Sequence, residues 1–133
     1  MNTRLAKELR ANIIEPVLWQ IGLGGKDAVS LLLGTAVAES GLQAFRQVNG
    51  PALGLWQMEP STHEDIWTNY LDYREDLVSQ IYAAANIAVA DAEVLVFNLR
   101  YACVMARVHY KRNPETIPST LEGQARYLSL IHI

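Results

Sequence analysis

Residues 28–41 read AVSLLLGTAVAESG, an almost wholly apolar run that ends in Glu39, Ser40 and Gly41. The run has no β-strand alternation, and it is long enough for a helix, which we expect from about Lys26 to Ser40. Gly41 is suited to cap the C-terminus of such a helix, because glycine adopts the left-handed conformation there without strain. A helix that is apolar on every side is normally buried. The sequence therefore predicts a buried helix with one carboxylate, Glu39, in its last turn.

Glu39 needs a physical reason to lie in such a helix. Burial disfavours the charged form of a carboxyl group, and the negative end of the helix dipole acts in the same direction. A carboxyl group that holds its proton near neutral pH is what a general acid needs. The alternative is that Glu39 tips into solvent or makes a structural hydrogen bond. Glu39 is therefore a candidate catalytic residue.

Length and composition predict a single globular domain over residues 1–133. Half of the 133 residues are hydrophobic, and the formal net charge of −3 offers no surface for nucleic acid. Cys103 is the only cysteine, so an internal disulfide is excluded, as is typical of a reducing compartment. His63, His109 and His132 are widely separated, and we expect neither a metal site nor a cofactor. We interpret His63 as part of a polar helix face.

The N-terminal eight residues mix charged and apolar side chains, which is unlike a secretory signal peptide. The apolar run from Ala28 to Ala38 is too short to span a bilayer. We therefore expect a soluble monomer, made in the cytoplasm and not inserted in a membrane. Residues 128–133 are apolar where a terminus is normally polar, which suggests a truncated or non-native end.

The rest of the chain predicts further helices, and hence a mainly α fold. A helix over residues 3–21 should be kinked or restarted at Pro16. Another should follow Pro60, with Ser61 and Glu64 at capping-box spacing. Residues 75–111 are helical again, with one break between residues 88 and 98, and a last helix begins near Leu121 behind a second capping box, Ser119 and Glu122. Residues 41–59 should form a loop or a poorly formed hairpin.

The second motif begins in that loop, continues into the helix expected after Pro60, and reads GPALGLWQMEPST over residues 50–62. Together with Glu39-Ser40-Gly41 it resembles the lysozyme-like superfamily, in which a helix ends in Glu-Ser-Gly and a loop then supplies Gly-Leu-x-Gln and Pro-x-Thr. The matching residues here are Gly54-Leu55-Trp56-Gln57 and Pro60-Ser61-Thr62. Within the superfamily, these motifs most resemble those of lytic transglycosylases and bacteriophage lysozyme-like domains. The resemblance is good from Val29 to Thr62 and loose in the later helices.

The resemblance implies a peptidoglycan-cleaving muramidase that acts on the β-1,4 bond between N-acetylmuramic acid and N-acetylglucosamine. Glu39 would be the general acid, with substrate contacts from Ser40, Gly54, Trp56 and Gln57. The residues themselves fit: glycines allow close approach to a ligand, and a glutamine side chain both donates and accepts hydrogen bonds. Trp56 offers a face for a sugar or for lining the acid's pocket, although a tryptophan in this context is more often core.

The second carboxylate is less clear. Glycoside hydrolysis generally uses two carboxyl groups, and Ala52 stands where the animal-type lysozymes carry an aspartate. Glu59 is the only carboxylate inside the loop: it either activates water as a base or has a structural role, holding the loop or capping the next helix. Lytic transglycosylases need only one carboxyl group, and a tyrosine on their last helix orients it. Tyr127 is the first candidate for that tyrosine and Tyr110 the second, although the residues after Tyr127 depart from the family pattern.

Two interpretations remain open from the sequence. One is an enzyme, either a lysozyme or a lytic transglycosylase, whose partner is the peptidoglycan glycan strand. The other is a non-catalytic peptidoglycan-binding or virion structural component with the same fold. Because peptidoglycan lies outside the cytoplasm, we expect phage-mediated release or delivery with the virion. Arg107, Lys111 and Arg112 are interpreted as a solvated helix end, the alternative being contact with acidic stem peptides or phosphate-bearing wall polymers.

Overall fold

The computed structural model describes residues 3–131 and is mainly helical, as predicted, with no β-strand in that part of the chain. The elements are α1 (Thr3–Leu9), the π-helical turn η1 (Arg10–Ile14), α2 (Glu15–Gln20), α3 (Lys26–Ser40), α4 (Pro60–Asn69), the 3₁₀ turn η2 (Leu71–Tyr73), α5 (Glu75–Ala85), α6 (Val94–Phe97), α7 (Leu99–Lys111) and α8 (Leu121–Ile131).

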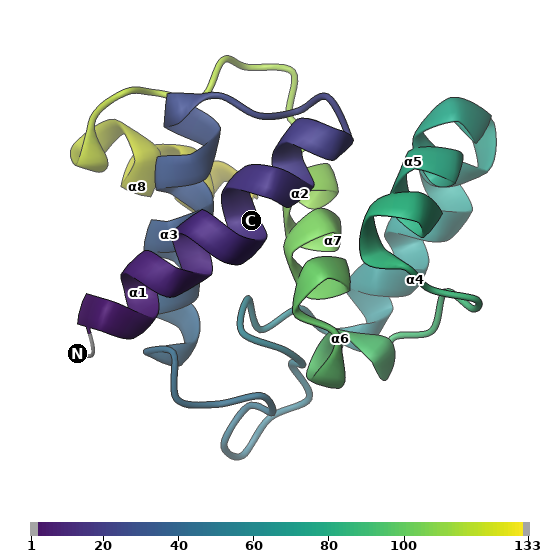
Figure 1. Cartoon of the computed structure of the whole chain (residues 1–133), viewed down its shortest axis with the longest axis horizontal. Helices are drawn as coiled ribbons and strands as arrows, with labels where there is room; N and C mark the ends of the chain where they lie inside the picture. The colour runs from purple at the N-terminus through teal and green to yellow at the C-terminus, as the bar shows by residue number, and fades with distance from the viewer. Residues whose placement is uncertain (1–2, 132–133) are drawn as a thin grey trace.

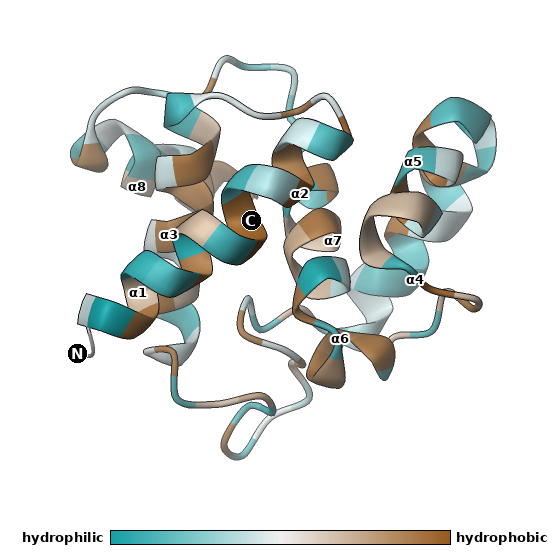
Figure 2. Cartoon of the chain, viewed as in Figure 1, coloured by the Kyte–Doolittle hydropathy of each residue, from teal (hydrophilic) through white to brown (hydrophobic). Residues whose placement is uncertain are grey.

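Helix α7 is the centre of the fold. It packs against α2, α3, α4, α5 and α6, and every side chain from Tyr101 to Val108 is buried. In Figure 1 it lies between the N-terminal helices with α8 on one side and α4 with α5 on the other. Figure 2 shows that hydrophobic residues line the inward faces of the surrounding helices, while hydrophilic residues face outward. The two groups of helices therefore share one core, built on α7.

The N-terminal helical segment is interrupted close to Pro16, as predicted. The turn η1 ends where the N–H of Glu15 donates to the carbonyl of Arg10, five residues back. Pro16 lies in the first turn of α2, where a missing N–H costs no intrahelical hydrogen bond. The proline is accommodated by restarting the α-helix.

Helix α3 has the predicted bounds, and Gly41 caps it in the left-handed conformation with φ of 61° and its N–H on the carbonyl of Val37. The prediction that α3 is buried on every side is wrong. Leu31, Leu32, Thr35 and Ala36 face the core, whereas Gly34 and Ala38 are exposed. Glycine and alanine count as apolar in a sequence pattern, but they carry so little surface that leaving them exposed costs little.

The remaining helices begin and end close to the predicted positions, but neither capping box is formed. Helices α5 and α7 are separated by residues 86–98, which contain only the short α6. Pro60 occupies the first turn of α4, so Glu59 rather than Ser61 takes the N-cap position, without a side-chain cap hydrogen bond. At α8 the hydroxyl of Thr120, not of Ser119, accepts from the N–H of Gly123 at 3.0 Å. At α4, Pro60 fixes the backbone of the first helical residue, and the residue before it therefore becomes the N-cap.

The motif loop, residues 50–60, is a small hairpin-like turn without strands. Leu53 forms isolated antiparallel bridges with Arg46 and with Met58. The Leu53 N–H donates to the Met58 carbonyl at 2.8 Å, and the Met58 N–H donates back at 3.0 Å. These bonds hold the four residues between them, 54–57, in a tight turn against the core.

None of the helices described between residues 3 and 131 combines the length and apolar character that crossing a bilayer requires.

Candidate functional site

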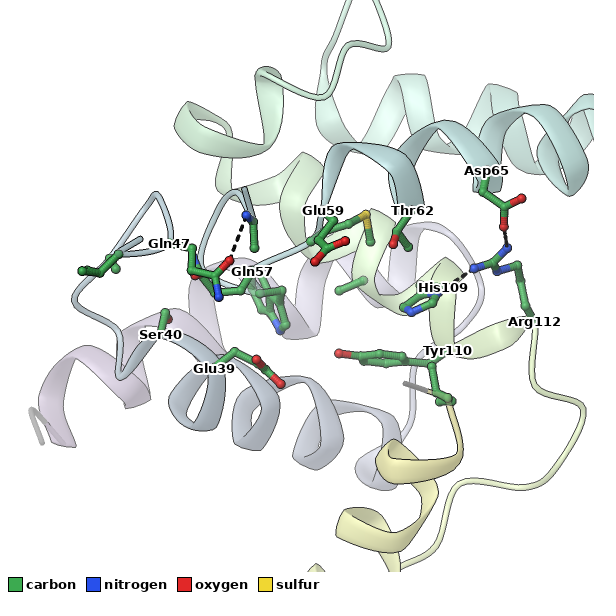
Figure 3. Close-up of a pocket in the computed structure, with 17 residues that line it drawn as sticks. Glu39, Ser40, Gln47, Gln57, Glu59, Thr62, Asp65, His109, Tyr110 and Arg112 are labelled. Carbon is green, nitrogen blue, oxygen red and sulfur yellow. Dashed lines mark hydrogen bonds and ion pairs between the residues drawn. The ribbon is translucent and has the colours of Figure 1, made fainter. Parts of the chain in front are cut away.

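The two motifs of the sequence meet at one cleft of about 820 Å³. One wall is the C-terminal end of α3, the other is the motif loop and the start of α4, and α7 lies between them (Figure 3). Of the predicted site residues, Glu39, Ser40, Trp56, Gln57 and Glu59 line this cleft. Gly54 and Tyr127 do not line it. The end of α3 and the motif loop thus line the same cleft.

Glu39 lies in the last turn of α3 and its side chain reaches the cleft, but the residue is exposed. Of the two alternatives considered from the sequence, burial of the carboxyl group is wrong, and Glu39 lies at the solvent. In Figure 3 the Tyr110 ring extends between the two walls and turns its hydroxyl toward Glu39. In agreement with this placement, the negative charge of Glu39 raises the pKa of Tyr110.

Ser40 lines the cleft, but its hydroxyl is used by the helix end. Its Oγ donates to the carbonyl of Ala36 at 2.8 Å and accepts from the N–H of Leu42 at 3.2 Å. These bonds satisfy backbone groups that the last helical turn leaves open. The geometry therefore gives Ser40 a part in fixing where α3 stops, and hence where Glu39 lies.

Gly54 shapes the loop from behind the cleft wall. Its φ is 78°, and a Cβ built on it would lie 2.5 Å from the carbonyl oxygen of Leu95. Its own carbonyl accepts hydrogen bonds from the backbone N–H of Gln57 at 2.9 Å and from Gln57 Nε2 at 2.8 Å. Only glycine fits this combination of left-handed backbone and close approach.

Gln57 is held by that same turn with a left-handed φ of 51°. Within residues 3–131 its side chain makes a single hydrogen bond, the one from Nε2 to the Gly54 carbonyl. Its amide oxygen retains its acceptor capacity on a residue that lines the cleft. The turn thus presents an oriented amide group to the cleft.

Trp56 belongs mainly to the core. It is 5% exposed, and its indole N–H donates to the carbonyl of Leu32 in α3 at 2.8 Å. The residue therefore ties the motif loop directly to the helix that carries Glu39. Of the roles considered from the sequence, core packing fits best, although Trp56 also belongs to the cleft lining.

Glu59 is exposed on the opposite wall from Glu39. It occupies the N-cap position of α4, with its carbonyl accepting from the N–H of His63 at 3.0 Å, yet its side chain makes no capping hydrogen bond. The helix-capping role considered for its carboxylate is therefore not formed. Glu39 and Glu59 therefore lie on facing walls of the cleft, Asp65 is a third carboxylate in its lining, and Ala52 supplies none.

Tyr127, the first candidate tyrosine, is buried outside this cleft, whereas Tyr110, the second candidate, lines it. The Tyr127 hydroxyl donates to the backbone carbonyl of Tyr110 at 2.9 Å, so Tyr127 supports the end of α7 from behind. Tyr110 is 2% exposed and lines the cleft. Burial raises the pKa of Tyr110, a hydrogen bond with Thr35 opposes this, and the negative charge of Glu39 raises the pKa further. Tyr110 therefore remains a neutral phenol beside Glu39 at physiological pH.

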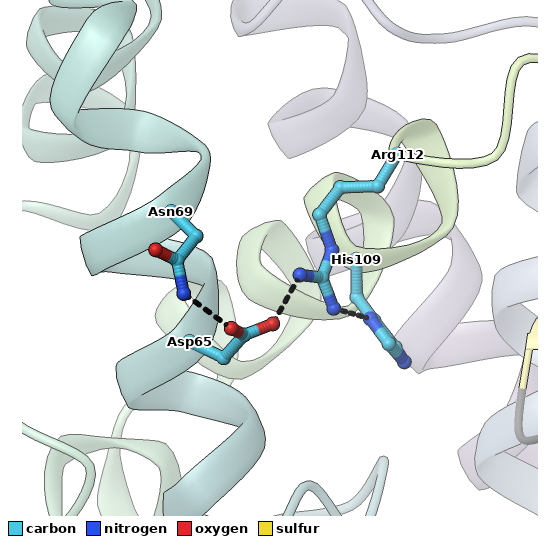
Figure 4. Close-up of polar contacts among 4 residues, drawn as sticks. All are labelled: Asp65, Asn69, His109 and Arg112. Atoms are coloured by element: carbon cyan, nitrogen blue, oxygen red, sulfur yellow. Dashed lines mark hydrogen bonds and ion pairs between the residues drawn. The ribbon is translucent and has the colours of Figure 1, made fainter.

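A polar cluster at the far end of the cleft was not predicted from the sequence (Figure 4). Arg112 Nη1 pairs with Asp65 Oδ2 at 2.7 Å, and Asn69 donates to Asp65 Oδ1 at 2.6 Å. The hydrogen bonds from Arg112 and then Asn69 hold the pKa of Asp65 below its ordinary value. Arg112 Nη2 also lies 2.9 Å from Nδ1 of His109. Since a guanidinium only donates, Nδ1 accepts and Nε2 carries the ring proton.

His63 is buried at 5% exposure, so its assignment to a polar helix face is wrong. Its Nε2 lies 2.5 Å from the hydroxyl of Tyr101, which also accepts from the indole N–H of Trp67 at 3.0 Å. Burial lowers the pKa of His63, and Asp91 acts weakly against that. The spacing of His63 from the buried Ile66, three residues on, is the signal that could have placed it on the inner face of α4.

Among residues 3–131 no three His, Cys, Asp or Glu side chains are grouped so as to hold a metal ion. His132, the third histidine considered from the sequence, and Ile133 lie outside the described residues.

Comparisons with protein-family models, with curated proteins and with solved structures find no match to this chain.

Proposed function

We propose that the chain is a lysozyme-like muramidase that cleaves the β-1,4 bond between N-acetylmuramic acid and N-acetylglucosamine in peptidoglycan. One observation carries the proposal: Glu39, at the end of α3, faces the motif loop with Gln57 and Glu59 across a single cleft. The two sequence motifs are separated by residues 42–49, yet both line this one cleft. The cleft is open and large enough for an extended glycan rather than for one small molecule alone.

Glu39 is the proposed general acid, which protonates the oxygen of the leaving sugar. A glycan strand lying in the cleft excludes water from the carboxyl group, and loss of water favours the neutral form of a carboxyl. Tyr110, a neutral phenol beside Glu39, is the proposed orienting residue. Gln57, with its amide oxygen directed by the Gly54 turn, is the proposed partner for an N-acetyl group.

Glu59 decides which of two reactions follows. If it activates water from the facing wall, the reaction is hydrolysis with inversion, as in two-carboxylate glycosidases. If it takes no part, Glu39 alone can serve as acid and then as base toward the C6 hydroxyl of the muramoyl residue, closing an anhydro ring. The exposed Glu59 side chain, without a capping role, supports the first route.

The second candidate is a domain that binds peptidoglycan or a protein partner without cleaving it. The exposure of Glu39 supports this candidate, because the folded protein alone does not provide the dry surroundings that a general acid uses. The same cleft would then act as a binding groove.

The deciding experiment is mass spectrometry of muropeptides released from purified peptidoglycan. Glu39→Gln keeps size and hydrogen bonding but cannot supply the proton, so we expect release to fall by at least about 100-fold with the fold intact. Glu64→Gln is the matched control, since Glu64 is exposed on α4 and does not line the cleft. Reducing ends would identify hydrolysis and anhydromuramoyl ends the transglycosylase reaction. No release by the folded wild-type protein would overturn the enzymatic proposal in favour of the binding domain.

A further inference from the structure

A second pocket, of about 470 Å³, lies at the opposite end of α3 from Glu39. It is bounded by the N-terminus of α3, the C-terminal part of α7 and the loop that leads to α8. Figure 1 shows the loops before α3 and before α8 on the same side of the molecule. Lys26 and Glu39 are thirteen residues apart in one helix, so the two sites are separated by about 20 Å. We call this the α3 N-terminal pocket.

Arg107 is the unusual residue of this pocket. It is 8% exposed, so it is not part of the solvated helix end predicted from the sequence. Its Nε donates to the carbonyl of Leu23 at 2.9 Å, which is the only hydrogen bond of its side chain within residues 3–131. None of the ion pairs in that part of the chain includes Arg107. No buried side-chain nitrogen in that part of the chain lacks a hydrogen-bond partner, so the two Nη groups, which make no hydrogen bond there, are reached by solvent at the pocket that Arg107 lines. The rest of the side chain is enclosed, and burial lowers the pKa of Arg107.

The N-terminus of α3 supplies donors to the same pocket. Lys26, Asp27 and Ala28 form the first turn, ahead of the first intrahelical donor, the N–H of Val29. The N-cap residue is Gly25, and no side chain caps the helix. Open N–H groups and the positive end of the helix dipole favour an anion at this position.

Charge around the pocket agrees with an anionic ligand. Lys26 and Lys111 are exposed at its rim, so three cations, including Arg107, face two carboxylates, Asp27 and Glu115. A guanidinium and a row of backbone N–H groups suit a tetrahedral oxyanion, since guanidinium groups bind phosphate in a bidentate manner. The volume admits a phosphate together with a small group attached to it.

We infer that the α3 N-terminal pocket is a phosphate-binding site, held by Arg107, the first-turn N–H groups of α3 and the rim lysines. The site is separate from the cleft, so it is independent of the proposed cleavage activity. A free phosphate monoester and the phosphodiester of a polymer share this chemistry, and they are distinguished below by the choice of probe.

Binding can be measured by ¹H–¹⁵N NMR titration of the full chain with inorganic phosphate, at constant ionic strength maintained with chloride. We expect saturable shifts of the amide signals of residues 26–28. Arg107→Lys keeps the positive charge but loses the paired N–H groups of the guanidinium. It should weaken binding about tenfold, which corresponds to the loss of one charge-assisted hydrogen bond. Asp27→Asn should tighten binding, because it removes a competing carboxylate from the first turn.

Two exposed variants keep the test informative if Arg107→Lys does not fold. Lys26→Gln and Lys111→Gln should each weaken phosphate binding, while Lys7→Gln on α1 should leave it unchanged. Glycerol 3-phosphate and a poly(glycerol phosphate) oligomer then separate the two sources: tighter binding of the monoester indicates a small metabolite, and tighter binding of the oligomer indicates a phosphate-bearing polymer. The inference is overturned if phosphate causes no saturable shift at residues 26–28, if acetate binds equally well, or if Lys26→Gln and Lys111→Gln bind phosphate like the wild type.

Discussion

Gly54→Ala should destabilise the protein more than any other alanine substitution at a glycine of the α3 and motif-loop region. Gly54 has φ of 78°, and its missing Cβ would lie 2.5 Å from the Leu95 carbonyl oxygen and 3.2 Å from the Leu95 carbonyl carbon. The left-handed backbone alone costs an alanine about 1–2 kcal/mol. The clash is with backbone of α6, which must move, and overpacking of this kind costs about 1–3 kcal/mol more. The expected loss in free energy of unfolding is therefore about 2–5 kcal/mol.

Two other glycines separate these contributions. Gly41 has φ of 61° with nothing within 4 Å of a built Cβ, so Gly41→Ala should show the cost of the left-handed backbone alone. Gly34 lies in the interior of α3 and also has nothing within 4 Å, so Gly34→Ala should stabilise by about 0.5–1 kcal/mol through helix propensity. The difference between Gly54→Ala and Gly41→Ala is the cost of the contact with Leu95.

The assay is urea unfolding followed by circular dichroism, with thermal unfolding as a second measure. A loss of 3 kcal/mol should lower the Tm by about 10 °C in a domain of this size. If Gly54→Ala loses no more stability than Gly41→Ala, then the loop does not press on α6 and the reasoning is refuted. If Gly34→Ala destabilises, then that face of α3 is not open.

Four further predictions concern the core. Burial lowers the pKa of His63, so below pH 6.5 the imidazole binds a proton in the unfolded state more readily than in the folded state. The free energy of unfolding should therefore fall as the pH drops through this range, and it should fall less in His63→Gln. Urea unfolding at pH 7 and pH 5 measures both. Tyr101→Phe removes a hydroxyl that the buried His63 and the partly buried Trp67 contact, and it should cost about 2–4 kcal/mol of unfolding free energy, with a smaller loss contradicting the network. Burial raises the pKa of Cys103, so its thiol should react with a disulfide reagent only after unfolding, and fast reaction in the native state would show that α7 is not central. Trp56→Phe loses the bond to the Leu32 carbonyl and should cost about 1–2 kcal/mol, seen as a lower urea midpoint.

The helices were predictable because local signals fix them. The bounds of α3 follow from an uninterrupted apolar run closed by Gly41, and the restart at Pro16 follows from one missing N–H. The caps were less predictable, since two residues in sequence compete for each cap. Pro60 selected Glu59 over Ser61, a choice that the proline itself indicates once it is recognised as the first helical residue.

The site was predictable in part, to the extent that the two motifs are local. That Glu39 and Gln57 share a cleft agrees with the resemblance from which they were proposed. The identity of the tyrosine depends on how α7 and α8 pack, which order along the chain does not encode, and so Tyr110 rather than Tyr127 lines the cleft. The link between Asp65 and Arg112 joins residues 47 positions apart and likewise has no local signature.

The exposure of Glu39 changes where its proposed acidity must come from. The sequence suggested that folding alone dries the carboxyl group, but α3 turns its small residues outward and leaves Glu39 at the edge of an open cleft. The fold therefore positions the Glu39 carboxylate without burying it. Ser40 hydrogen-bonds the end of α3, Trp56 links α3 to the motif loop, and Tyr110 lies near the carboxylate. Under the proposed function, exclusion of water is left to the ligand, since a glycan strand across the cleft would cover what the protein does not. On this reasoning short substrates that leave Glu39 wet should be cleaved poorly even when they bind, and a kcat that rises with glycan length is the kinetic sign that distinguishes the enzyme from a binding groove.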